Sequence, residues 1–175
     1  MTQSSQTETS EIAIFGRALR ALELIHGSTF PVEHFIQPVA HPMHCGIDAR
    51  SAVVQADESG NHFFVKVLLA EQRLFCDFSA TVEASTRAAE AGLAPPLIVS
   101  DAAHSALLYQ ALTDDWHCAM GPDLRKATVR EAVIQAKKAW HAQQSLSRTQ
   151  TSFERIQLLS EMISSGIEKH IPNNA

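Results

Sequence analysis

The 175-residue sequence predicts an α+β fold, in which a small antiparallel sheet of about five strands has a packed helix, a leading helix and a C-terminal helical extension. Five short segments rich in β-branched and aromatic residues occur between residues 35 and 112. Apolar residues at helical spacing precede them and return after residue 113. We therefore expect a disordered lead and helix over residues 1–28, a sheet-bearing lobe over 29–113 and helices over 114–175.

The leading helix is predicted by an apolar stripe that ends near Gly27, a residue common just after helices. The stripe consists of Ile12, Phe15, Leu19, Leu22 and Ile25. Residues 1–10 are polar and lack the pattern of a secretory signal, so we expect them to be disordered.

Strands are expected over residues 35–39, 51–56, 62–69, 97–100 and 105–112. The turn residues 57–61 separate the second strand from the third, which predicts a hairpin.

Three further helices follow from start and stop signals. A helix over residues 77–91 is ended by Gly92 and the following prolines. Thr128 with Glu131, and Thr151 with Glu154, have the spacing of capping boxes ahead of apolar stripes, so two more helices are expected.

Composition limits the classes of partner. The formal net charge is −5 and the basic residues are scattered, so we expect no nucleic acid partner. No apolar stretch approaches the roughly 20 residues of a membrane-spanning helix, so we expect no membrane and a cytoplasmic protein. Three widely separated cysteines favour reduced thiols. His41, His44 and Cys45 share a loop, but no second pair completes a metal site, so no metal is expected.

Lys66 is the residue of greatest chemical interest in the sheet. Alternation along the strand places Val65 and Val67 on one face and Phe64 and Lys66 on the other. A partly buried ammonium is costly unless it meets a carboxylate or phosphate, so we expect a partner. The alternative is that the stem of Lys66 lies along the sheet and its head reaches water.

Glu83, in the helix after that strand, has two interpretations. It presents its carboxylate toward the sheet, or it forms an ordinary surface ion pair with Arg87, four residues on. Local spacing favours neither.

Three segments, in this order, resemble the aminoglycoside phosphotransferase and choline kinase-like families. They are Phe64-Val65-Lys66-Val67-Leu68, Glu83 followed by Ala-Gly-Leu-Ala-Pro-Pro at 91–96, and Leu107-Leu108-Tyr109-Gln110-Ala111-Leu112. The resemblance covers residues 35–142 and implies the N-terminal lobe of a protein kinase-like fold that binds ATP.

The resemblance also implies roles for single residues. Lys66 would contact the α and β phosphates, and Glu83 would pair with Lys66. Gln110 to Leu112 would be the hinge, whose main-chain groups hold the adenine edge, and Gly46 would belong to the loop over the phosphates. The acceptor would be a small hydroxylated molecule.

Apolar residues near the hinge have two interpretations as well. By the resemblance, Leu112 and Val53 would sandwich the adenine ring. Plain core packing explains both equally well.

The family's catalytic loop is absent from the sequence. That loop contains His-x-Asp, an asparagine five residues after the aspartate and a further aspartate for magnesium. We therefore expect no catalytic residue, an inactive protein when this chain stands alone, and magnesium binding only with a complete C-lobe. The rival hypothesis is a degenerate kinase-like binding or interaction module that forms a homo-oligomer through its last two helices.

Overall fold

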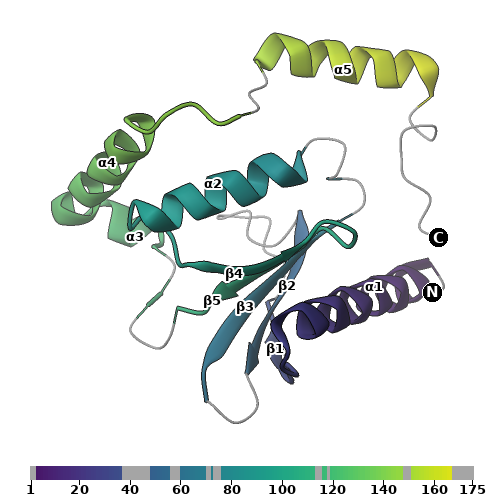
Figure 1. The fold of residues 1–175 in the computed structure, drawn as a ribbon. Coiled ribbons are helices and arrows are strands. Elements are labelled where there is room, and N and C mark those ends of the chain that lie inside the picture. The colour runs from purple at the N-terminus through teal and green to yellow at the C-terminus, as the bar shows by residue number, and fades with distance from the viewer. Residues whose placement is uncertain are drawn as a thin grey trace.

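The computed structural model describes residues 3–36, 48–55, 60–69, 72, 76–112, 116–117, 119–147 and 151–166. Figure 1 shows a twisted sheet with α1 (Gln3–His26) against one face and α2 (Phe78–Glu90) against the other. Three helices follow the sheet, namely α3 (Gly121–Leu124), α4 (Ala127–His141) and α5 (Ser152–Ser165). The predicted α+β class is confirmed.

The sheet is antiparallel throughout, with strand order β1-β2-β3-β5-β4. Its strands are β1 (Val32–Phe35), β2 (Ala49–Gln55), β3 (His62–Leu68), β4 (Leu97–Asp101) and β5 (Ala106–Gln110). The predicted pairing of β2 with β3 is confirmed, with Ser51 opposite Lys66. The three inner strands, β2, β3 and β5, are therefore each paired on both sides.

Two predicted boundaries at the start of the chain are wrong. The helix begins at Gln3 instead of after Ser10, because residues 3–10 contain no glycine or proline to stop it. The first strand is Val32–Phe35 instead of 35–39, of which residues 37–39 lie outside the described part. Pairing with β2 determines where this strand begins, since Gln55 N of β2 donates to Pro31 O at 3.1 Å.

The main core lies between α1 and the sheet. Phe15, Ala18 and Leu22 of α1 are buried at helical spacing, and Ile12 and Ile25 at the two ends of the predicted stripe are exposed. Phe30, in the connection to β1, packs with this cluster. The sheet contributes alternate residues, which are Ala52, Val54, Phe63, Val65, Val67, Ala106 and Leu108.

The predicted capping boxes have different outcomes. Thr128 is not a cap, because α4 begins at Ala127 and Lys126 stands at the N-cap without a side-chain bond. The short α3 just before it fixes this start, and Lys126 Nζ lies 2.9 Å from an Asp123 oxygen. At α5 the box is confirmed, since Thr151 and Glu154 exchange both hydrogen bonds.

Within the described residues, none of the helices combines the length and the apolar character that crossing a membrane requires. Cys76 is a free thiol, as expected, and Cys45 and Cys118 lie outside the described part.

We predict that Leu22→Ala lowers the free energy of unfolding by about 2–5 kcal/mol, because it opens a cavity where α1 meets the sheet. Leu22 is 0% exposed and Leu24 is 78% exposed on the same helix. Leu24→Ala is therefore the matched control and should change stability by less than about 0.5 kcal/mol. Urea unfolding measures both, and equal losses would contradict the packing of α1.

Candidate functional site

The face of the sheet under α2 carries polar and aromatic side chains from β3 and β5. Strand alternation turns Phe64 and Lys66 of β3 toward this face, with Tyr109 of β5 beside them. Ser85 of α2 and Tyr109 form a hydrogen bond of 2.9 Å between their hydroxyls. Burial raises the pKa of Tyr109, although the bond from Ser85 opposes the shift. Tyr109 therefore acts as a neutral contact that fixes α2 to the sheet.

A cavity of about 660 Å³ lies at one end of this face. Val53, Phe64 and Leu112 supply apolar walls, and Trp116 borders the cavity after the last strand. Its polar lining includes the pair Glu33 and His62, whose Oε2 and Nε2 atoms are 3.3 Å apart. The predicted hinge residues Gln110 to Leu112 therefore do line a cavity, and its volume suits a small molecule.

Main-chain hydrogen bonds in the predicted hinge leave one amide unused. Gln110 N donates to Pro96 O at 3.0 Å, and Ala111 N donates to His62 O at 3.1 Å. Among the described residues, the N–H of Leu112 has no such acceptor. Leu112 is thus the amide of this segment that remains for a ligand in the cavity.

Lys66 has an acidic partner, as its position on the strand predicts. Its Nζ lies 3.9 Å from Oδ2 of Asp48, and its side chain is 34% exposed. Asp48 stands just before β2, and the register of β2 with β3 brings it to the end of the strand that contains Lys66. An exposed pair at this distance is weak, so the ammonium can exchange Asp48 for another anion at little cost.

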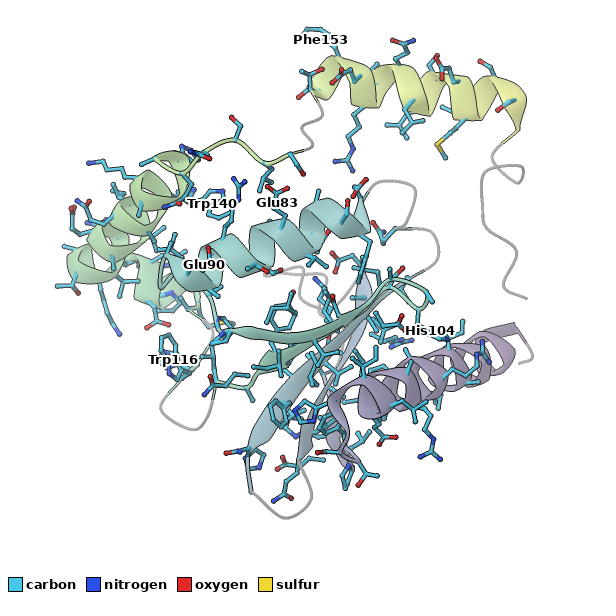
Figure 2. All side chains as sticks on the ribbon, in the orientation of Figure 1. Glu83, Glu90, His104, Trp116, Trp140 and Phe153 are labelled. Atoms are coloured by element: carbon cyan, nitrogen blue, oxygen red, sulfur yellow. The ribbon has the colours of Figure 1, made fainter. Side chains whose placement is uncertain are left out.

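The expected pair of Lys66 with Glu83 does not form in this structure. Oε1 of Glu83 lies 2.6 Å from Nη2 of Arg87, which is the surface pair that the helical spacing allows. Figure 2 shows Glu83 on the side of α2 that faces away from the sheet. The cause is helical phase, since Ala84, Ser85 and Ala88 occupy the side of α2 that lines the sheet.

Glu83 and Arg87 hold the connection that leads from α4 toward α5. Glu83 accepts hydrogen bonds from the amide of Ser147 at 2.9 and 3.1 Å, and also from its hydroxyl. Arg87 donates to the carbonyls of Gln144 at 2.8 Å and Ser145 at 3.0 Å. We call these five residues the α2 clasp. It ties the helical extension to the sheet-bearing lobe.

The remaining candidate site residues fall between residues 41 and 46, before β2. Gly46, proposed for the phosphate loop, lies outside the described residues, as do His41, His44 and Cys45. Among the residues that are described, no group of three or more His, Cys, Asp or Glu could hold a metal ion.

Sequence reasoning missed Asp48, Trp116 and the Glu33–His62 pair. The register of the β2–β3 hairpin was the signal for Asp48. Ser51 pairs with Lys66 and Ala49 pairs with Leu68, so the residue before Ala49 lies beside the end of the strand that contains Lys66. No sequence signal pointed to Trp116 or to the Glu33–His62 pair. These residues are far apart in the sequence, and only the tertiary structure brings them to one cavity.

No family model, curated protein or solved structure matches the chain.

We predict that the α2 clasp makes stability depend on pH through Glu83. Hydrogen bonds from Ser147, first from its hydroxyl and then from its amide, hold the pKa of Glu83 below its ordinary value of 4.5, and Arg87 adds to the effect. A lowered folded pKa stabilises the protein above that ordinary value, and the contribution is lost as the pH falls through the folded pKa. Glu83→Gln should therefore destabilise the protein near neutral pH and progressively less in acid.

The urea unfolding midpoint, measured from neutral pH into acid, reports the effect, and Glu90→Gln is the control. Glu90 lies on the same helix and is exposed, and no contact of this kind is seen for it among the described residues. If the difference in unfolding midpoint between Glu83→Gln and the unmutated protein stayed constant with pH, Glu83 would not be the source of the pH dependence.

Proposed function

We propose that this chain is the ATP-binding portion of a small-molecule phosphotransferase similar to the aminoglycoside and choline kinases. One observation carries the proposal. Lys66 and Phe64 lie two residues apart on β3 and on the same face of the sheet, and Phe64 lines the cavity at the hinge. A base at the hinge and a phosphate at the lysine therefore have a continuous path.

The cavity suits an adenine ring. Val53 and Leu112 supply apolar contacts, and Phe64 and Trp116 supply aromatic ones. The N–H of Leu112, which has no acceptor among the described residues, would provide the donor for the edge of the base, and neighbouring carbonyls would provide the acceptor. The ribose hydroxyls would then meet Glu33 or His62, since both line the same cavity.

The phosphates belong at Lys66. Its side chain is 34% exposed, and among the described residues its ammonium is paired with Asp48 alone, at 3.9 Å, so a phosphate oxygen competes well for it. Glu83 has no part in this arrangement, because it is bound to Arg87 and Ser147. The proposal extends to nucleotide binding and not to transfer, since no residue of the sequence is assigned to accept the proton of an acceptor hydroxyl.

We predict that ATP at about ten times its Kd raises the melting temperature by about 3–6 °C, and that Lys66→Ala abolishes most of the rise. Adenosine lacks phosphates, so its smaller rise should be the same in Lys66→Ala as in the unmutated protein. Differential scanning fluorimetry measures both. Lys138→Ala, on α4 and away from the cavity, is the control for loss of a lysine.

The absence of any shift at millimolar ATP in the unmutated protein would overturn this proposal. A shift with ATP that survives Lys66→Ala would leave nucleotide binding and remove the role of the lysine.

The exposed face of α5 favours the second candidate, an interaction module. Phe153, Ile156 and Ile163 are 84%, 62% and 70% exposed, and Figure 2 shows Phe153 at the start of the helix, pointing away from the rest of the chain. Apolar side chains gathered on one helix are typical of an interface.

We predict that the purified protein self-associates and that Ile156→Glu shifts it toward the monomer, because the charge would be buried between copies. Gln157→Glu adds the same charge one residue away, about 100° around α5 from Ile156, and should change self-association less than Ile156→Glu does. Sedimentation velocity over a range of concentrations distinguishes the two variants. A monomer at every concentration in the unmutated protein would contradict the module hypothesis.

A further inference from the structure

A groove distinct from the cavity lies between α4, the sheet and the second half of α2. Its volume is about 690 Å³, within the range of small-molecule sites. It adjoins the cavity, because Phe64 and Pro95 line both. It therefore offers a second place for a ligand on the same face of the sheet.

The walls of the groove are apolar. α2 contributes Ala84 and Ala88, whose short side chains leave space beneath α4, and none of the described side chains of α2 is fully buried. α4 contributes Val133 and Trp140 from the opposite side, and Figure 2 shows Trp140 between the two helices. An apolar molecule placed there would remove this surface from water.

The charges of the groove have one sign. Among the described residues, the charged members of its lining are Lys66 and Lys137, and the carboxylate of Asp48, 3.9 Å from Lys66 Nζ, lies outside that lining. The cavity differs, since Glu33 is the charged carboxylate among its described lining residues and no described lysine or arginine lines it. The groove therefore attracts anions in a chain whose formal net charge is −5.

A hydroxyl of the groove also has a hydrogen to donate. Ser85 and Tyr109 carry two O–H groups between them, and one is used in their mutual bond of 2.9 Å. Among the described residues, no acceptor takes the other hydrogen. Both residues line the groove, so this donor is available to an anionic oxygen.

We propose that the groove binds an amphiphile with an apolar body and a carboxylate end. The body lies between α2 and α4 against Trp140, and the carboxylate meets Lys137 at the α4 wall, with the hydroxyl pair of Ser85 and Tyr109 as a further donor. The ligand goes beyond the proposed nucleotide, whose base occupies the cavity and whose phosphates lie at Lys66, on the sheet side of the groove.

The two tryptophans of the chain make the sites separately observable. Trp140 lines the groove and Trp116 lines the cavity, so Trp116→Phe leaves a reporter of the groove alone. Decanoate should change the fluorescence of this variant with saturation below its micelle concentration. Decyltrimethylammonium has the same tail and the opposite charge and should bind at least about fivefold more weakly. Equal binding of the two would overturn the proposal.

Two matched pairs of variants test the location. Lys137→Gln should weaken decanoate about two- to fivefold, whereas Lys138→Gln, one residue away and outside the groove, should not. Ala136→Phe fills the groove and should weaken binding about tenfold or more, whereas Ala139→Phe should leave it unchanged. Circular dichroism confirms that all four variants are folded. Equal effects within either pair would overturn the location.

Nucleotide binding in the cavity and decanoate binding in the groove can be tested separately. Trp140→Phe leaves Trp116 to report adenosine and ATP in the cavity. Decanoate should bind the nucleotide-free protein whether or not this chain proves to bind a nucleotide. Adenosine should not change the affinity for decanoate in the variant that retains Trp140. Displacement of decanoate by adenosine would mean one shared site and would overturn the groove.

Discussion

Side chains along β3 point alternately to the two faces of the sheet, one toward the core with α1 and the other toward the candidate sites under α2. Val65 and Val67 are buried against the core that α1 completes, so the register of the strand is fixed by the hydrophobic effect. Phe64 and Lys66 must then point to the face under α2. A lysine in the middle of a sheet is therefore held in place by apolar packing on the other side, and the cavity and the groove both depend on that placement.

The position of α2 over this face is fixed by different forces. Its inner side contacts the sheet through short residues and the Ser85–Tyr109 bond, and none of its described side chains is fully buried. Its outer side is held by the ion pair of Glu83 and Arg87 and by their bonds to the connection after α4. The loose inner packing leaves room for the groove, and the outer contacts keep α4 nearby as its second wall.

The two sites differ in polarity although they share Phe64 and Pro95. The cavity combines aromatic walls with an acid, two imidazoles and a main-chain amide that has no acceptor among the described residues. The groove combines apolar walls with two ammonium groups. Phe64 stands at their junction, and Lys66, two residues further along β3, lines the groove.

The sequence by itself determined the α+β class, the β2–β3 hairpin and the extent of α2, and it predicted, as one of two interpretations, an anionic partner for Lys66. Each follows from the spacing of neighbouring residues, from glycine and proline signals or from the cost of burying a charge. Only the tertiary structure decided that this partner is Asp48 and that Glu83 turns to Arg87 and Ser147. Strand register and helix phase set those contacts, and both depend on how whole elements pack, which no local pattern contains.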